Sequence, residues 1–406
     1  MIVKEIGGGV CAAKGFKAAG VHAGIRKNRT KKDLALIVSE KRAAAAGTYT
    51  LNLVKGAPIY VTKENISDGF ASAVICNSGN ANTCNANGVE IAKEMCSLAG
   101  AELGISEKDI IVASTGVIGQ PLEIAPIKNA MKELCGELSP SGSGAAAEAI
   151  MTTDTVKKEI AFTFTVGGKE CHIGGIAKGS GMIHPNMATM LVFVTTDAAI
   201  TPNMLQTALS KDVCDSFNMI SIDGDTSTND MVSVLANGMA ENDLIESEGE
   251  TFDEFCEALR AVTVFLSRSI AKDGEGASKL LECRVCGAKD KENARKVAKS
   301  VICSSLFKAA MFGADANWGR ILCAIGYSGA ETDIGKISVW LSSKAGRIFV
   351  CSGGSGVDFD EDEAKKVLSE DEIIIEISLG DGSSEAVAWG CDLTYDYVKI
   401  NGDYRT

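Results

Sequence analysis

The chain has 406 residues, of which 46% are hydrophobic and 5% aromatic, and its formal net charge is −13. This length allows a large buried core and exceeds one typical domain, so we expect two domains or two closely packed lobes. The acidic balance excludes nucleic acid and anionic membranes as partners, because both bind clusters of lysine and arginine. No apolar run approaches the length of a membrane-spanning helix, and we expect no membrane partner.

The fourteen cysteines are scattered singly along the chain. Residues 1–10 hold charges and a glycine triplet instead of the apolar core of a signal peptide, so we expect a cytoplasmic protein with reduced cysteines. Cys283 and Cys286 form a CxxC motif. A four-ligand zinc site needs a second pair at usable spacing, and the sequence offers none, so we expect no metal.

The first half of the chain predicts alternating helices and strands. Residues 71–76 and 110–113 are short apolar runs that lead into the polar loops 77–82 and 114–116. Both runs are typical of buried strands whose carboxyl ends open into loops. Backbone donors exposed at such loops often build binding sites.

A hairpin is predicted next, with strands at 160–166 and 170–176 joined by Gly167 and Gly168. A glycine-rich segment over 178–189 then leads into 190–194, an apolar run typical of a strand buried on both faces.

The second half keeps the mixed character, which favours an α/β class of fold. Thr201 followed by Pro202 indicates a helix start, and apolar residues continue on one face to Val213 and Phe217. Two further helical stripes and three strands follow: helices over 252–270 and over 294–312 with Gly313 as C-cap, and strands over 337–341, 347–351 and 373–379.

Histidine-based catalysis finds little support in the sequence. The chain has three histidines, His22, His172 and His184, and no G-x-S-x-G motif accompanies them. A phosphate-binding loop of the G-x-x-x-x-G-K-[ST] type is also absent. Catalysis would therefore need another base.

The glycine-rich segment before the strand at 190–194 could supply that base. A strained turn there could present the Thr189 hydroxyl to the carbonyl carbon of Ala188, and an N-to-O acyl shift with hydrolysis would free Thr189 as a new N-terminus. An α-amino group titrates at about 7.7–8.0, so it can act as a base near neutral pH. The alternative is that Thr189 is a β-branched residue in its favoured place at the start of a strand.

The string KGSGMIHPNMATML at 178–191 resembles the self-cleavage signature of the ornithine acetyltransferase family, the glutamate N-acetyltransferases of arginine biosynthesis. The resemblance covers essentially the whole chain in family order. The other matching strings are KGFKAAGVHAGI at 14–25, DLALI at 33–37, NSGNAN at 77–82, STGVIG at 114–119, MTTDT at 151–155, DGDTSTND at 223–230, KDGEGA at 272–277 and GADANWGR at 313–320.

The resemblance implies a layered α/β sandwich, of class α/β or α+β, with two interlocked lobes. It implies cleavage between Ala188 and Thr189 into an alpha fragment, 1–188, and a beta fragment, 189–406. These fragments would stay associated, and two of each would form a heterotetramer.

The resemblance also implies the catalytic roles. Thr189 would be the cleavage nucleophile and the acetyl carrier, and the Thr115 hydroxyl with the Gly116 N–H would form the oxyanion hole. Donors fixed at a glycine turn suit that task, because they are in place before charge develops. From the residues alone, Thr115 and Gly116 equally fit an ordinary turn.

Six residues are implied to bind the amino-acid substrate. Lys178 would meet a carboxylate and Glu275 an ammonium group, although a lone charged residue is otherwise most often a solvated surface group. Asn401 and Thr406 lie near the chain end, so their role requires the tail to dock. The full set is Thr152, Lys178, Thr189, Glu275, Asn401 and Thr406.

The implied reaction is a ping-pong acetyl transfer from N-acetylornithine to glutamate through acetyl-Thr189, without a resident cofactor. Acetyl-CoA is a possible second acetyl donor, and the sequence does not decide this point. Two alternatives stay open: a self-processed aminopeptidase or amidase that releases the acyl group to water, and a non-catalytic amino-acid-binding protein.

Overall fold

The computed structural model describes residues 3–26, 30–184 and 190–402. The chain divides into two compact units. The first unit takes residues 1–179, 186–214 and 226–266, and the second takes 180–185, 215–225 and 267–406. Each unit is built on its own sheet flanked by helices, so the predicted α/β fold is confirmed.

The first unit contains one mixed sheet, to which nine strands belong in the described part of the chain. Strand β2 pairs with β3 beside the main path of the sheet. Along that path the strands are β1 (Lys4–Ile6), β6 (Lys158–Val166), β7 (Lys169–Lys178), β8 (Leu191–Thr196), β10 (Met231–Ala236), β3 (Leu34–Tyr49), β4 (Phe70–Asn77) and β5 (Ile110–Ser114), with β2 at Phe16–Val21.

Both faces of the central strands are buried. Successive side chains alternate between faces, so Leu34 and Leu36 pack toward helices α2 and α3, while Ala35 and Ile37 join a second core with α4. This burial explains why the strands are continuous apolar runs. The helices of this unit are α1 (Ala57–Asn65), α2 (Gly88–Leu103), α3 (Ile124–Gly136), α4 (Ser143–Ile150) and α5 (Pro202–Asp212), with short 3-10 turns η1 (Gly9–Cys11) and η2 (Glu107–Asp109).

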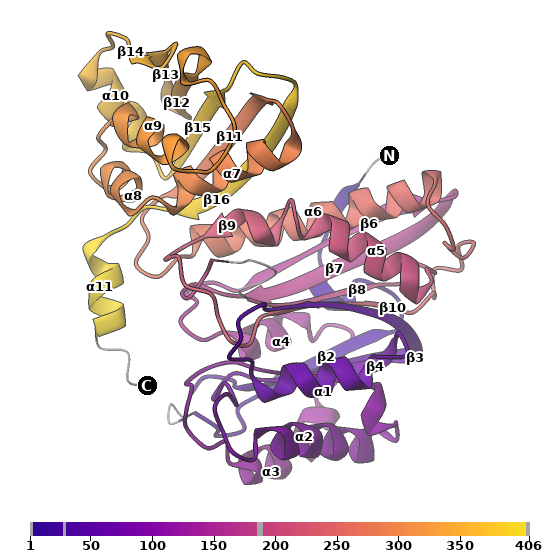
Figure 1. Cartoon of the computed structure of the whole chain (residues 1–406). Helices are drawn as coiled ribbons and strands as arrows, with labels where there is room; N and C mark the ends of the chain where they lie inside the picture. The colour runs from indigo at the N-terminus through magenta and orange to yellow at the C-terminus, as the bar shows by residue number, and fades with distance from the viewer. Residues whose placement is uncertain (1–2, 27–29, 185–189, 403–406) are drawn as a thin grey trace. The chain divides into compact units, whose positions relative to one another are not determined.

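The first sheet interleaves strands from before and after the predicted cleavage point, as Figure 1 shows by colour. Strand β8 pairs with β7 on one side and with β10 on the other. Strand β10 also pairs along six residues with β3, from Met231 opposite Tyr49 to Ala236 opposite Ala44. Fragments divided at residue 188 would therefore share one sheet.

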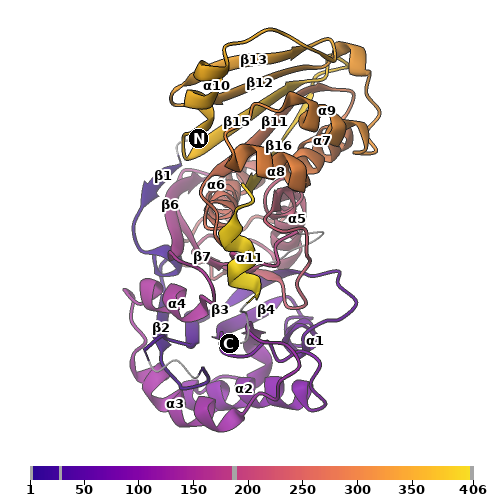
Figure 2. The same ribbon diagram turned by 90° about the vertical axis from the view of Figure 1, so that its left-hand side faces the viewer.

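The second unit is a smaller sheet with helices on it, visible edge-on in Figure 2. Helix α7 packs on β11 and β16, and α10 packs on β12 and β13. In the described residues its strands run β14 (Ser355–Gly356), β13 (Gly346–Ser352), β12 (Ser338–Ser343), β15 (Glu372–Ser378), β11 (Leu280–Ala288), β16 (Ser384–Cys391) and β9 (Ile220–Ser221). Its helices are α7 (Lys291–Cys303), α8 (Ser305–Phe312), α9 (Trp318–Gly326), α10 (Glu361–Leu368) and α11 (Tyr395–Gly402), with 3-10 turns η3 (Phe217–Met219) and η4 (Ile334–Lys336).

One long helix, α6 (Glu250–Lys272), contributes residues to both units. Its apolar stripe gives the first unit Phe255, whose ring lies 6.4 Å from that of Phe164 on β6. None of the helices in the described ranges is long and apolar enough to cross a bilayer.

Most predicted elements are confirmed, and two helix predictions need correction. The helix capped by Thr201 ends at Asp212, and Phe217 belongs to η3 instead. The single helix predicted over 294–312 is two helices, because Ser304 leaves the helical conformation and caps α8 by accepting a hydrogen bond from the Phe307 N–H. The apolar stripe runs through this break, so periodicity alone could not reveal it.

Candidate active site

The predicted oxyanion residues lie at the carboxyl ends of two parallel strands, β4 and β5. Gly116 has a φ of 129°, and a Cβ there would come within 2.9 Å of the Asn80 nitrogen and of the Gly79 carbonyl carbon. Asn77 holds this turn, because its backbone oxygen accepts a 2.9 Å hydrogen bond from the Thr115 N–H. The turn therefore requires glycine at 116, for both conformation and space.

Two donors of this turn have no acceptor within the described part of the chain, so they could bind a ligand. Among the described residues, no acceptor is hydrogen-bonded to the Gly116 N–H or to the Thr115 hydroxyl. Asn229 fixes the strand end before them: its side-chain amide donates to the Ser114 oxygen at 2.9 Å. Adjacent donors on a fixed turn can stabilise negative charge that develops on a carbonyl oxygen.

Thr152 and Lys178 are brought together around the buried carboxylate of Asp154. One oxygen of Asp154 accepts the Thr152 N–H at 3.0 Å, and the other accepts the Gly179 N–H at 2.7 Å. The ammonium group of Lys158 lies 2.7 Å from the same carboxylate, and both of these side chains are almost fully buried. Asp154 thus positions both substrate-binding candidates of the first unit.

Opposing effects act on the pKa of Asp154. Burial raises this pKa, but the positive charges of Lys178 and Lys158 lower it by more, and the result is a pKa of about 2. Asp154 is therefore charged near neutral pH and compensates the two lysines. Lys178 is itself buried, and no hydrogen bond from its ammonium group to another described residue is present.

Arg26 connects this cluster to the oxyanion turn, and the sequence reasoning missed it. Its guanidinium donates to the Ser78 backbone oxygen at 2.8 Å and also to the backbone oxygen of Met151. Arg26 and Lys178 both lower the pKa of the Cys76 thiol, although burial, the larger effect, raises it to about 12. Two cations therefore lie near the end of β4, where a substrate carboxylate would be stabilised.

In the second unit, the structure brings Glu275 and Asn401 together. The Asn401 side-chain amide donates to a Glu275 carboxylate oxygen at 2.8 Å. Helix α11 therefore contacts Glu275, and the docking of the chain end into the substrate site stays a prediction. Ala188, Thr189 and Thr406, which are also predicted site residues, lie outside the described residues.

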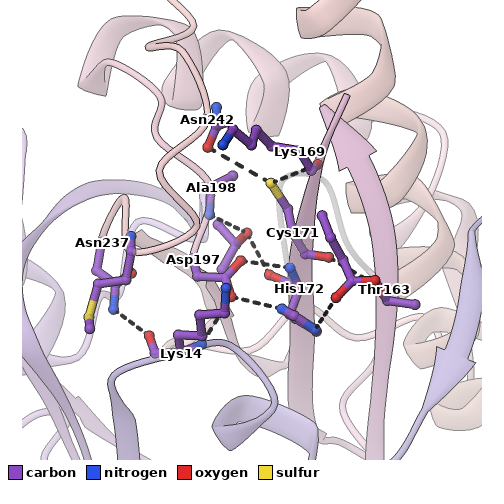
Figure 3. Close-up of polar contacts among 12 residues, drawn as sticks. Lys14, Thr163, Lys169, Cys171, His172, Asp197, Ala198, Asn237 and Asn242 are labelled. Carbon is purple, nitrogen blue, oxygen red and sulfur yellow. Dashed lines mark hydrogen bonds and ion pairs between the residues drawn. The ribbon is translucent and has the colours of Figure 1, made fainter. Parts of the chain in front are cut away.

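A histidine–aspartate pair is present elsewhere in the first unit (Figure 3). His172 Nδ1 lies 2.9 Å from Asp197, whose carboxylate also accepts the backbone N–H groups of His172 and Lys14. These contacts join β7, the end of β8 and the segment before β2. None of the predicted site residues takes part, so we assign this pair a structural role.

The CxxC motif lies on strand β11, with Cys283 buried and Cys286 exposed. Positions three apart on a strand point to opposite faces, which does not suit a shared metal ion. In the described ranges, no group of three or more histidine, cysteine or acidic side chains is placed to hold a metal. The expectation of a protein without a metal stays a prediction.

Comparison with known proteins shows which family the chain resembles. The ArgJ family model matches residues 17–406. The arginine biosynthesis bifunctional protein ArgJ of Symbiobacterium thermophilum is 52% identical over 99% of both chains, and ArgJ 1 of Clostridium acetobutylicum is 51% identical over 96% of both. A crystal structure of ArgJ from Bacillus halodurans is 47% identical, with a TM-score of 0.51, and covers 53% of this chain and 100% of its own.

The α/β fold and these relatives define the class of protein as an acyltransferase. The chain belongs to the ArgJ family.

Proposed function

We propose that the protein transfers the acetyl group of N-acetylornithine to glutamate, giving ornithine and N-acetylglutamate. The observation that carries this proposal is the free donor pair at Thr115 and Gly116 in a chain of the ArgJ family. Thr189 attacks the acetyl carbonyl, the donor pair stabilises the oxyanion, and ornithine leaves. Glutamate then attacks the acetyl ester on Thr189, with the α-amine of Thr189 as base and acid.

The substrate contacts follow the charges of each unit. Thr152 and Lys178 are proposed to bind the substrate carboxylate, which the positive charge of Arg26 near Cys76 also favours. Glu275 is proposed to bind the ammonium group, with Asn401 and Thr406 as further substrate-binding residues. Thr189 contributes both the nucleophile and a substrate contact.

The active form is proposed to arise by self-cleavage between Ala188 and Thr189. The Thr189 hydroxyl attacks the Ala188 carbonyl carbon, the peptide C–N bond breaks, and the amine takes a proton; water then hydrolyses the ester. The half-length solved chain of the Bacillus halodurans relative, 53% of this chain, supports two fragments of this size. The pairing of β8 with β7 and of β10 with β3 supports their staying together.

Further parts of the proposal concern the state of the protein in the cell. The fourteen cysteines are all free, which supports a reducing, cytoplasmic location. The names of the relatives call those proteins bifunctional, and we propose that a second activity of this chain uses acetyl-CoA as the acetyl donor. We also propose a heterotetramer of two alpha and two beta fragments, without a resident cofactor.

The decisive experiment supplies N-acetylornithine with a labelled acetyl group and analyses products and protein by mass spectrometry. With glutamate present we expect labelled N-acetylglutamate, and without glutamate a labelled acetyl ester on the peptide that begins at Thr189. Labelled acetate as the main product would favour the aminopeptidase or amidase alternative. Labelled N-acetylglutamate formed from acetyl-CoA in a parallel reaction would establish the second donor.

A further inference from the structure

A single carboxylate in the second unit holds the chain shortly before the predicted cleavage point. One oxygen of Asp223 accepts the Met182 N–H at 2.6 Å, and the other accepts the Ile183 N–H at 2.8 Å. The Ile222 N–H donates in turn to the Ile183 oxygen at 2.7 Å. Two consecutive peptide groups are thus fixed from one side.

The backbone held in this way has an unfavourable conformation. Met182 has a φ of 56°, in the left-handed region that non-glycine residues seldom adopt. Hydrogen bonds from backbone N–H groups to a charged carboxylate are stronger than neutral ones. Asp223 therefore stabilises a turn that the sequence of residues 182–183 would not adopt alone.

Glu275 fixes the two preceding residues. Its backbone N–H donates to the Ser180 oxygen at 2.7 Å. A Cβ on Gly181 would come within 2.4 Å of the Glu275 carboxyl group, so this glycine allows the chain to lie directly against the carboxylate. Four consecutive residues, 180–183, thus contact Glu275 or Asp223.

Helix α11 contacts both acidic residues. The Asn401 amide donates to Glu275 at 2.8 Å, and the Tyr397 side chain lies near enough to Asp223 for the negative charge of that carboxylate to act on it. Burial, followed by the negative charge of Asp223, raises the pKa of Tyr397, so its hydroxyl stays a donor. The helix is seated on the same loop, because the Thr394 hydroxyl donates to the Gly276 oxygen at 2.7 Å.

We propose that Asp223 is a positioning residue for self-cleavage, and that Tyr397 of α11, which lies beside Asp223, supports it. This inference rests on the self-cleavage proposed above. Asp223 binds the chain at Met182 and Ile183; its proposed role is to restrict the chain that leads to the Ala188–Thr189 peptide bond. A restricted chain spends more time in the geometry from which the hydroxyl can attack.

The test follows the appearance of the two fragments by intact mass in freshly purified full-length Asp223→Asn protein, beside wild type. We expect cleavage about tenfold slower, since one charged acceptor of two backbone donors is lost. We expect kcat and KM per cleaved molecule to stay close to the wild-type values, which a general structural defect would not allow. Met182→Gly in the Asp223→Asn background should restore part of the rate, because glycine adopts the left-handed turn without strain.

Two further variants complete the design. Asp225→Asn makes the same charge change at an exposed side chain and should cleave as wild type does. Tyr397→Phe removes one hydroxyl and should slow cleavage about threefold. The proposal is overturned if a folded Asp223→Asn protein cleaves itself at the wild-type rate. If that variant does not fold, cleavage of Tyr397→Phe at the wild-type rate overturns the proposal instead. A wild-type chain that stays whole contradicts self-cleavage itself, and this inference fails with it.

Discussion

The two clusters of predicted site residues are held in different ways. In the first unit, Asp154, Lys158 and Lys178 compensate each other's charges within the protein interior. In the second unit, Asp223 and Glu275 are only half-buried, and they accept hydrogen bonds from a loop backbone and from a chain-terminal helix. The first arrangement is part of the core, and the second depends on a small helix.

This difference indicates how each cluster responds to change. Removing one member of a buried charged group leaves the others uncompensated, which costs stability. When a half-exposed carboxylate loses one contact, water can replace the lost hydrogen bond, so the free energy of unfolding falls only slightly. The change then alters the positions of the groups that the carboxylate held. Mutations in the first cluster should therefore lower the free energy of unfolding, and mutations in the second cluster should change the rates of cleavage or acetyl transfer.

The largest effect on stability is expected for Asp154→Asn. The substitution removes the buried ion pair between Lys158 and Asp154, and we expect the free energy of unfolding to fall by about 3 kcal/mol. Chemical denaturation of the purified protein measures this change. Asp225→Asn, at an exposed position, serves as the control and should change the free energy of unfolding by less than about 0.5 kcal/mol. Equal stabilities for both variants would contradict the proposed difference between the two clusters.

Gly116→Ala should affect catalysis strongly. A Cβ at 116 would meet the Asn80 nitrogen at 2.9 Å and displace the donor pair, and we expect kcat for acetyl transfer to fall about 100-fold. Gly119→Ala is the matched control, because Gly119 also has a positive φ but nothing lies within 4 Å of its added Cβ. Similar kcat values for the two variants would contradict the proposal that this turn stabilises the oxyanion.

The loss of stability at acidic pH should depend on the protonation of Asp154. Its folded pKa, about 2, lies below the ordinary value of 3.8, so its contribution is fully present above the ordinary value and is lost as pH falls toward the folded value. We expect this group to account for a loss of about 2 kcal/mol between about pH 5 and pH 2. The measurement is the free energy of unfolding as a function of pH for wild type and for Lys178→Met. The two curves should differ, because the variant should lose the stabilisation by Asp154 at a higher pH.

Asn401→Ala should have the smallest effect. It removes the hydrogen bonds that the Asn401 amide donates to the half-buried Glu275 and to the Tyr397 backbone oxygen, and we expect a stability change of less than about 1 kcal/mol with a KM increase of about threefold. Steady-state kinetics and thermal unfolding of the same preparation measure both quantities. A loss of stability as large as that of Asp154→Asn would erase the distinction between the two clusters.

Sequence patterns predicted the strands that end at the site, because β4 and β5 are short apolar runs followed by polar loops. They did not predict Ser304 as a helix break, since the apolar stripe continues through it. The motif strings containing Asp154 and Asp223 were recognised without a role for either residue. Their function depends on backbone N–H groups distant in sequence, Gly179 for Asp154 and Met182 for Asp223, and one-dimensional patterns do not report such pairs.

The site itself was predicted in part. Thr152 and Lys178 came from resemblance, and the structure joins them through Asp154; Glu275 and Asn401 are likewise in contact. Arg26 was missed because it stands outside any catalytic pattern and acts through backbone oxygens. The roles of all the predicted site residues stay predictions, and Ala188, Thr189 and Thr406 also lie outside the described residues.

The central claim is that the chain cuts itself before Thr189 and then uses this residue as an acetyl carrier. Intact mass and N-terminal sequencing of freshly purified wild-type protein, beside Thr189→Ala, test it most directly. We predict two wild-type fragments, one beginning with Thr189, and a variant that stays at full length without acetyl transfer. A wild-type chain that stays whole while transferring acetyl groups would contradict the claim, because the free α-amine would then not be needed.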